Sequence, residues 1–522
     1  MSEWEQTMVN DVLLTATDIK QLQEAGLSAE QVLRQIALLK SGLPPLRLDR
    51  PATAGDGIVI IPAAEHRRLV ALHEAAAAAG RFMKFVPASG AASRMFINWQ
   101  SILARGGFSG QLEEAEFKEN LPKFAFFGDL KKIIAARGED IETLLTSGNL
   151  RRILHFILTP EGLNYGSLPK ALIKFHAYDQ EANRSAMEEH LVEAALYTTD
   201  AHRECRLHFT VSDEHLPVAS RFLEEICPGY EQQLKVTFRI GLSCQSCASN
   251  TVALEGQELY RDGRGLLILR PGGHGALLDN LQALDGDIVF IKNIDNVAPD
   301  RFKPVITLHK KILGGYFIGL EEEIFRHLQE LSGGDARSEA VRQALLFCRQ
   351  KLLWDVPAAL AGSSLLQQRE LIIERLNRPL RVCGIVRNEG EPGGGPFWID
   401  AEEGQSLQIV EAQQIDGRSE QQKARWAAGT HFNPVDLVCG LRDYRSQKFD
   451  LPRFCDPQTA TLTQKIEGVR KIKVLEHPGL WNGSMARWNT VFVEVPNATF
   501  NPVKTIDDLL RPQHLPEGQV LR

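Results

Sequence analysis

The spacing of apolar residues along the chain switches repeatedly between the helical and the strand pattern. The first 50 residues read as helical, with a capping box of Ser28 and Gln31 before an apolar run that ends at Gly42. Further along, short apolar runs predict strands, and amphipathic or alanine-rich stretches between them predict helices. The predicted strands cover 56–63, 81–87, 167–176, 206–212, 235–243 and 287–296, and the predicted helices cover 64–80, 183–201 and 215–226.

This alternation predicts an α/β fold with a mixed, mostly parallel sheet and helices on both faces. Two longer helical stretches interrupt the alternation, at about 97–160 and at 318–378, and we interpret both as insertions. The part after them is richer in strands and in Gly/Pro turns. We therefore expect an N-terminal helical segment at 1–55, an α/β core at 56–317, the helical insertion at 318–378, and a second half of the core with the C-terminal region at 379–522.

The composition argues against several classes of protein. The 522 residues are 43% apolar and 24% charged, and the formal net charge of −7 disfavours a surface for nucleic acid or for an anionic membrane. No stretch approaches the ~20 apolar residues of a membrane span, and the acidic N-terminus shows no secretory signal. The eight scattered cysteines suit reduced thiols, so we expect a cytoplasmic protein. Cys244 and Cys247 form a lone CxxC, which we interpret as two ordinary thiols in preference to a zinc or redox site.

The stretch "FVPASGAASRM", residues 85–95, places a run of small side chains between a predicted strand and a predicted helix. Small residues let a backbone pass close to a ligand, helix N–H groups point at anions, and arginine binds phosphate through paired hydrogen bonds. A phosphate-binding loop fits this pattern, and a tight turn packed for steric reasons fits it equally well. The residues concerned are Ala88, Ser89, Gly90, Ala91, Ala92, Ser93 and Arg94.

Two further polar clusters fall at predicted strand ends. In "LRPGGHGALLDNL", three glycines surround His274, which suits either a ligand approached by the backbone or a structural histidine. In "FIKNIDNVAPD", a buried strand ends in Asn293 and Asp295, and a carboxylate at that place is a natural Mg²⁺ ligand, although an Asx-turn is the ordinary alternative. Lys504, beside a proline before a predicted helix, would not stand out alone.

The order of these segments resembles the UDP-sugar pyrophosphorylase superfamily, which includes the UTP–glucose-1-phosphate uridylyltransferases and the UDP-N-acetylhexosamine pyrophosphorylases, and within it an uncharacterised bacterial branch. Two glycines of that family's loop signature are replaced here by Ser89 and Ala92, and an acid is replaced by Ala276. Val211 stands where the family reads uracil with a glutamine, so the base is left open. The segments that carry the resemblance are 89–94, 169–170, 271–276, 292–296, 393–397, 409–413, 432–438 and 501–510.

The resemblance implies a nucleotide-diphospho-sugar transferase fold of the GT-A, Rossmann-like type, with nucleotide binding in 56–317 and sugar binding in 379–522. It implies a transferase that joins a nucleoside triphosphate and a sugar 1-phosphate and releases pyrophosphate. Arg94, Lys170 and Lys504 would be the catalytic cations, and Asp295 would hold Mg²⁺. The implied nucleotide-binding residues are Ala88, Ser89, Gly90, Ala91, Ala92, Ser93, Gly272, Gly273, His274 and Gly275, and the implied sugar-binding residues are Asn293, Asn388, Glu389, Gly394, Glu411 and Asn433.

Two alternatives stay open from the sequence. A glycosyltransferase that consumes a nucleotide sugar would keep an acidic metal motif without needing Arg94 or Lys504. A catalytically silent nucleotide-sugar-binding protein would explain the lost glycines and Ala276. Retention of the four charged residues at 94, 170, 295 and 504 favours the nucleotidyltransferase, because a chain that only binds has no need of every charge-neutralising group.

Overall fold

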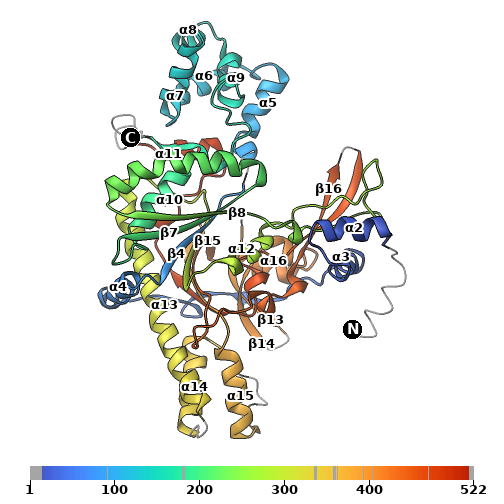
Figure 1. Cartoon of the computed structure of the whole chain (residues 1–522), viewed down its shortest axis with the longest axis vertical. Helices are drawn as coiled ribbons and strands as arrows, with labels where there is room; N and C mark the ends of the chain where they lie inside the picture. Colours follow the sequence, from blue (N-terminus) through green and yellow to red (C-terminus); the bar gives the residue numbers. More distant parts are fainter. Residues whose placement is uncertain are drawn as a thin grey trace. The chain divides into compact units, whose positions relative to one another are not determined.

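The computed structural model, shown in Figure 1, describes residues 14–90, 92–178, 183–333, 338–354, 356, 360, 362–391, 393–401, 404–467 and 469–516. The chain forms two compact units, each assembled from stretches that are far apart in sequence. What we call the first unit comprises the described residues within Met1–His66, Gln245–Val289 and Tyr316–Glu494. The second unit comprises those within Arg67–Cys244, Phe290–Gly315 and Val495–Arg522.

The second unit is built on the strands β11, β4, β7 and β8, which neighbour one another in that order. Register pairs such as Lys84↔Leu207 and Leu207↔Ile240 show that β4, β7 and β8 run parallel. Side chains of these strands such as Phe85 and Phe209 are fully buried, because both faces of this part of the sheet are covered. The bounds are β4 Phe82–Pro87, β7 Glu204–Val211, β8 Thr237–Cys244 and β11 Ile288–Lys292. Only the last three residues of β11 belong to this unit.

Helices accompany these strands, and the stretch after β4 that was predicted to be helical, at about 97–160, consists mostly of helices. Its helices share one hydrophobic cluster with the sheet, in which Phe126 and Phe156 join Val86 and Phe209. Figure 1 shows α5 to α9 gathered beside one another. The helices are α4 Ala63–Ala78 from Arg67 onward, α5 Ile97–Arg105, α6 Gln111–Asn120, α7 Phe127–Ala136, α8 Ile141–Thr146, α9 Leu150–Leu158, α10 Ala186–Ala195, α11 Leu216–Leu234 and the first half of α13 Lys303–Ser332. The short strands β5 Lys174–His176 and β6 Arg184–Ser185 pair antiparallel.

The first unit contains a mixed set of strands in the order β2–β3–β18–β12–β15. β12 pairs parallel with β18 and antiparallel with β15, so the predicted mixture of pairings is confirmed. Two smaller sheets, β1–β13–β14 and β10–β9–β17–β16, complete the unit. The bounds are β1 Leu48–Pro51, β2 Thr53–Ala54, β3 Gly57–Val59, β9 Ala253–Glu255, β10 Glu258–Leu259, β12 Leu380–Arg387, β13 Gly395–Ala401, β14 Gly404–Val410, β15 His431–Gly440, β16 Thr461–Glu467, β17 Arg470–Glu476 and β18 Asn489–Glu494.

The first unit includes two N-terminal helices within the segment predicted to be helical, of which residues 1–13 lie outside the described residues, and helices within 318–378. The capping box of Ser28 and Gln31 is present at the start of α3, and Gly42 with φ 80° ends that helix. Leu22 and Ile36 from the N-terminal pair pack on Leu254 and Leu475 of the four-stranded sheet. The helices are α2 Ala16–Glu24, α3 Ala29–Ser41, α12 Leu277–Ala283, α14 Ser338–Lys351, α15 Leu365–Leu376, α16 Glu420–Ala427 and the second half of α13. Within the described residues, no helix is long and apolar enough to cross a membrane.

Two predicted elements are wrong. The end of the segment that read as helical, Leu48–Pro51, is a strand that pairs with β13, because Pro51 lacks the N–H that a helix needs and Leu48 packs into a small cluster with Phe397. The stretch 167–176 is a strand only at 174–176, since a 3₁₀ turn at Lys170–Leu172 follows Pro169. Proline disfavours regular pairing at that point and turns the chain.

Candidate phosphate-binding site

The small-residue loop follows the carboxyl end of β4 in the second unit, as predicted. Ala88 and Ala92 are fully buried, and their backbone N–H groups donate to Thr210 O and Leu168 O at 2.9 and 3.2 Å. Gly90 is exposed, and a Cβ atom placed there would meet nothing within 4 Å. The N–H groups of Ser89 and Gly90 donate no hydrogen bond to any described residue. The loop therefore presents free backbone donors at an open surface; Ala91 lies outside the described residues.

Lys170 connects this loop to two distant segments of the same unit. Its backbone N–H donates to Gly90 O at 3.1 Å, so the 3₁₀ turn after Pro169 lies against the loop despite the intervening helices. Its Nζ donates to Asp295 Oδ2 at 3.2 Å and to Val503 O at 2.9 Å. The Lys170 side chain is only 12% exposed and that of Asp295 is 25% exposed. The resemblance predicted both residues, and the structure brings them into contact.

The segment after β11 carries Asn293 and Asp295 to the same edge. Ile294 N–H donates to Pro87 O at 3.2 Å, so β11 and β4 end side by side. Asn293 O accepts from Asn296 N–H at 3.2 Å, which is the tight turn expected of an Asn/Asp-rich strand end. Asp295 O accepts from Val503 N–H at 3.0 Å, which places the segment containing Lys504 beside it. Loops at the carboxyl ends of parallel strands are where α/β folds bind ligands.

Arg94 and Lys504 are the exposed cations of this region. The Arg94 side chain is exposed and has no hydrogen-bond or ion-pair partner within the described part of the chain. The Lys504 side chain is also exposed, and its backbone N–H donates to Asp508 Oδ2 at 2.7 Å. Ile506 N–H donates to Met95 O at 3.2 Å, so the segments carrying these two cations are hydrogen-bonded to each other. Positive charge beside free backbone N–H groups suits an anionic group such as phosphate.

A buried ionic cluster on α10 supports the segment that carries Asp295. Glu193 accepts from Lys84 Nζ at 3.0 Å and from Lys292 Nζ at 2.7 Å, and all three side chains are at most 1% exposed. One turn earlier, His190 Nε2–H donates to Ile294 O at 3.2 Å. Burial alone would raise the pKa of Glu193, but Lys292 and Lys84 outweigh it and hold that pKa well below its usual value. The cluster thus fixes both residues that flank Asn293.

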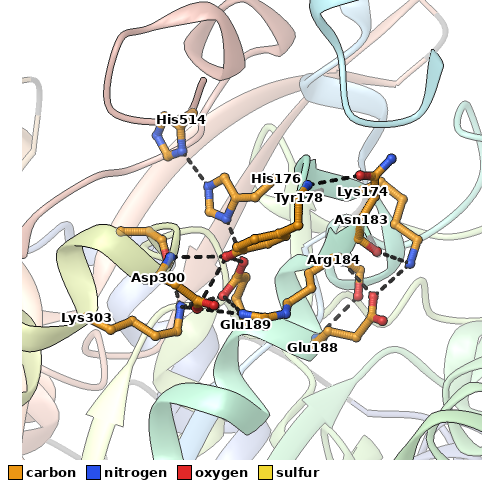
Figure 2. Close-up of polar contacts among 12 residues, drawn as sticks. Lys174, His176, Tyr178, Asn183, Arg184, Glu188, Glu189, Asp300, Lys303 and His514 are labelled. Atoms are coloured by element: carbon orange, nitrogen blue, oxygen red, sulfur yellow. Dashed lines mark hydrogen bonds and ion pairs between the residues drawn. The ribbon is translucent and has the colours of Figure 1, made fainter. Parts of the chain in front are cut away.

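A second buried network on α10 surrounds Glu189, and Figure 2 shows His176, Tyr178 and Lys303 converging on this carboxylate. Glu189 Oε1 accepts from Tyr178 Oη at 2.6 Å and from His176 Nδ1 at 2.9 Å, and Oε2 pairs with Lys303. His176 Nε2 in turn lies 2.8 Å from His514 Nδ1. Since His176 Nδ1–H donates to Glu189, the neutral pair requires His514 Nδ1–H to donate to His176. This chain of bonds ties the C-terminal segment to α10.

Neither network on α10 was found from the sequence. The stretch "SAMEEHLVEAA" reads as an ordinary charged helix, although Ser185 and Glu188 do form a capping box at its start. The residues that could have indicated a buried ionic cluster lie in the strands. Lys84 interrupts "RFMKFVP" and Lys292 ends "DIVFIK", and a lysine inside an apolar strand requires a buried acidic partner.

The glycine segment with His274 lies in the first unit, where neighbouring chain accounts for its glycines. A side chain at Gly272 would collide with His477 and with Ser249 O, and one at Gly275 would collide with Pro478 O. Gly273 has φ 73°, which favours glycine. His274 Nδ1 accepts from Leu480 N–H at 3.2 Å and its ring stacks on Trp481 at 4.3 Å. Burial lowers the pKa of His274 to about 4. The structural alternative therefore explains these residues, and a role in nucleotide binding stays a prediction.

The residues predicted to bind sugar are distributed over both units. Asn293 belongs to the second unit and the other five to the first. Asn433 is buried, and its N–H donates to Gly394 O at 2.9 Å, which brings those two together. Asn388 and Glu389 are exposed in a turn, where Asn388 Oδ1 accepts from Gly390 N–H at 2.9 Å. Glu411 Oε2 accepts from Gln413 Nε2 at 3.0 Å.

Asp295 is the residue available for a metal ion at the candidate site. The described residues contain no group of three or more His, Cys, Asp or Glu side chains placed to hold a metal. A single partly exposed carboxylate fits Mg²⁺, which is commonly bound by one or two carboxylates together with substrate phosphates and water. It does not fit a metal held by protein ligands alone.

Comparison with known proteins gives a family and several similar structures. No curated protein matches. The uridine diphosphate N-acetylglucosamine pyrophosphorylase from Trypanosoma brucei is 13% identical, with a TM-score of 0.46 over 98% of this chain and 79% of that chain. A UDP-glucose phosphorylase from Trypanosoma brucei is 12% identical, with a TM-score of 0.44 over 95% and 77%. A UDP-glucose pyrophosphorylase variant from Leishmania major in complex with UDP-glucose is 11% identical, with a TM-score of 0.43 over 95% and 79%. The family model that matches residues 15–515 is described as a domain of unknown function, DUF4301, and the chain belongs to that family.

Proposed function

We propose that the chain is a sugar-1-phosphate nucleotidyltransferase, acting on a nucleoside triphosphate and a sugar 1-phosphate and built on a fold of the nucleotide-diphospho-sugar transferase type. The observation that carries the proposal is the convergence of the small-residue loop, Lys170, Asp295 and the Lys504 segment at one edge of the second unit. These stretches are far apart in sequence, and each was singled out by its chemistry or by the family resemblance. Three cations beside free backbone N–H groups suit a reaction between two phosphorylated substrates.

In this reaction an oxygen of the sugar phosphate attacks the α-phosphorus of the triphosphate in line. A new P–O bond forms, the bond from the α-phosphorus to its bridging oxygen breaks, and the electron pair leaves with pyrophosphate. Positioning and charge neutralisation therefore supply most of the catalysis. Backbone N–H groups of Ser89 and Gly90 would bind the triphosphate. Arg94 would neutralise the leaving pyrophosphate, and Lys170 and Lys504 would neutralise the reacting phosphates.

Magnesium would complete the charge balance of the proposed site. A bound Mg²⁺ polarises phosphoryl oxygens and offsets the charge that develops on them. Asp295 would hold the ion together with substrate oxygens, and Lys170, which contacts the same carboxylate, would keep Asp295 in place. This chemistry does not specify the nucleotide base or the sugar, because the residues concerned act only on phosphate.

The test is pyrophosphate release by the full chain with Mg²⁺, each of the four ribonucleoside triphosphates and dTTP, and a panel of sugar 1-phosphates. Asp295→Asn and Lys504→Ala are assayed beside two exposed controls, Glu119→Gln and Lys20→Ala. We expect release that needs one particular pair of substrates and is lost in the two site variants only. Release with no pair, by a folded chain that still binds nucleotide sugars, would exclude the proposal and favour a glycosyltransferase or a silent binding protein.

A further inference from the structure

The strand β16 forms an open edge of the four-stranded sheet in the first unit (Figure 1). Of the described strands it pairs with β17 alone, in a register that runs from Thr461↔Glu476 to Glu467↔Arg470. Natural edge strands are usually protected from a further strand by proline, by bulges or by unpaired charges. β16 contains no proline and no shift of register, and its lysine, Lys465, pairs with Glu476 at 3.3 Å. The edge is therefore able to accept another strand.

The hairpin determines which backbone groups of β16 face this edge. Glu467 and Arg470 are partners across only two intervening residues, so they exchange both of their backbone hydrogen bonds. Every second residue before Glu467 bonds to β17 in the same way, because an antiparallel ladder alternates. The N–H and C=O groups of Leu462, Gln464 and Ile466 consequently point away from β17, toward the open edge.

The two ends of the hairpin differ in a complementary way. Near the turn, Ile466 is 74% exposed and Val469 is 98% exposed. Near the start of β16, Leu462 and Leu43 line an open groove of about 320 Å³, and both leucines pack on the cluster of the N-terminal helices. An extended strand holds its two ends apart. The apolar projection of one copy can therefore enter only the groove of another copy.

We propose that two copies of this chain associate through antiparallel pairing of their β16 strands, with a two-fold axis at Gln464. In that register Leu462 lies opposite Ile466 of the partner subunit, and Gln464 lies opposite its own counterpart. Each of these pairs exchanges two N–H···O bonds, because the groups that face the edge in one copy meet those of the other. The same register brings the partner's Val469 toward Thr459, which also lines the groove. The exposed apolar side chains of each hairpin are thereby covered.

The sequence of β16 selects this axis over its neighbours. With the axis at Gln464, Lys465 and Glu467 both lie opposite threonines, so no like charges face each other directly. An axis at Lys465 would place two lysines opposite each other, which destabilises a strand pair. An axis at Thr463 would leave Ile466 beyond the end of the partner strand. An axis between two residues would set edge-facing groups against groups that already bond to β17.

Sedimentation velocity of the full chain over a dilution series tests this association, and we expect a monomer–dimer equilibrium. Gln464→Pro removes an N–H that only the second copy uses, and Ile466→Lys places a charge opposite Leu462. Each change should raise the dissociation constant roughly tenfold or more, because proline and lysine both oppose pairing at a sheet edge. Leu112→Lys is the matched control, since Leu112 is 88% exposed and lies on α6, and it should leave the dissociation constant unchanged.

A second pair of variants tests the register. Thr461 would lie opposite Glu467 of the partner subunit, so Thr461→Lys should tighten the dimer several-fold and Thr461→Glu should weaken it. Equal effects of these two changes would exclude the register proposed.

The proposal would be overturned by a chain that stays monomeric at every concentration, or by a dimer whose dissociation constant is unchanged in both Gln464→Pro and Ile466→Lys. Urea unfolding of each variant separates lost association from lost folding. Ile466→Lys alters only an exposed side chain, so it decides the matter if Gln464→Pro does not fold. No nucleotide or sugar phosphate enters these measurements, so their outcome is independent of the proposed reaction.

Discussion

Lys170 Nζ lies 3.2 Å from Asp295 Oδ2, although the two residues are 125 positions apart in sequence. The same amino group donates to Val503 O, and the backbone N–H of Lys170 donates to Gly90 O. One lysine thus joins the loop after β4, the segment after β11 and the C-terminal segment. A substitution of Lys170 therefore acts on geometry as well as on charge.

The first prediction separates these effects with a double-mutant cycle of Lys170→Met and Asp295→Asn. Each single change should lower the turnover of the proposed reaction by on the order of 100-fold, because each removes a charged group next to the reacting phosphates. The double variant should lose less than the product of the two, since both changes break the same ion pair. The measurement is pyrophosphate release together with the melting temperature of each variant.

The matched control for this cycle is the ion pair of Lys123 with Glu119, in which Nζ and Oε1 are also 3.2 Å apart but the carboxylate is exposed. Lys123→Met and Glu119→Gln should leave turnover unchanged. Equal losses of turnover in both cycles would mean that the Lys170–Asp295 pair has no special part in the reaction.

The second prediction contrasts Gly90 with Ala92 in the small-residue loop. Gly90→Leu should leave the free energy of unfolding within about 0.5 kcal/mol of the native value, because Gly90 is exposed and a Cβ added there meets nothing within 4 Å. It should nevertheless weaken nucleotide binding, since it covers the free N–H groups of the loop. Ala92→Leu should cost about 1–3 kcal/mol of stability, because Ala92 is fully buried in the hydrophobic core.

Urea unfolding and nucleotide titration of both variants check this contrast. Ala92 is among the residues that the family resemblance implies for nucleotide binding, and its burial predicts that Ala92→Leu acts mainly on packing. Full nucleotide affinity in Gly90→Leu would show that the loop does not contact the ligand.

The fold was predictable to the extent that local patterns decide it. The strands β4, β7, β8 and β11 and both helical insertions follow from apolar periodicity, and the α3 boundaries follow from Ser28, Gln31 and Gly42. The failures occur where long-range pairing overrides the local pattern. Leu48–Pro51 becomes a strand only because β13 is there to pair with it.

The candidate site was predictable only in part. The small side chains at 88–93 stand out by composition, and Lys170 was found only through the family resemblance. Nothing in the local sequence shows that Lys84 and Lys292 face Glu193, because that contact depends on how α10 packs on two strands. Close packing against Ser249, His477 and Pro478 accounts for the glycines at 272 and 275 without a ligand, and their role in nucleotide binding stays a prediction.

The third prediction concerns Glu193. Glu193→Gln should lower the free energy of unfolding by about 3–5 kcal/mol, because it leaves Lys84 and Lys292 buried without their shared negative charge. Adding Lys84→Met and Lys292→Met should recover much of the loss, since apolar residues of similar volume often replace buried ion pairs well. Urea unfolding measures both effects, with the exposed Glu119→Gln as control. A Glu193→Gln variant as stable as the native chain would show that the negative charge of Glu193 does not stabilise the buried Lys84 and Lys292.

The last prediction is a dependence of stability on pH that arises from His73. Its Nε2–H donates to Tyr197 O at 2.8 Å and its ring stacks on Phe82 at 4.6 Å, and burial lowers its pKa from 6.5 to about 4. Between these two values the unfolded chain binds a proton that the folded chain does not. Stability must therefore fall as the pH is lowered from 6.5 to 4, and the contribution of His73 is flat above 6.5. The change in the free energy of unfolding should approach about 3 kcal/mol across that window.

His73→Gln, which keeps a donor for Tyr197 O, should flatten the pH dependence of the urea midpoint relative to the exposed control His202→Gln. If the two variants show the same slope below pH 6.5, the folded chain accepts a proton at His73 and the ring is not held neutral by burial.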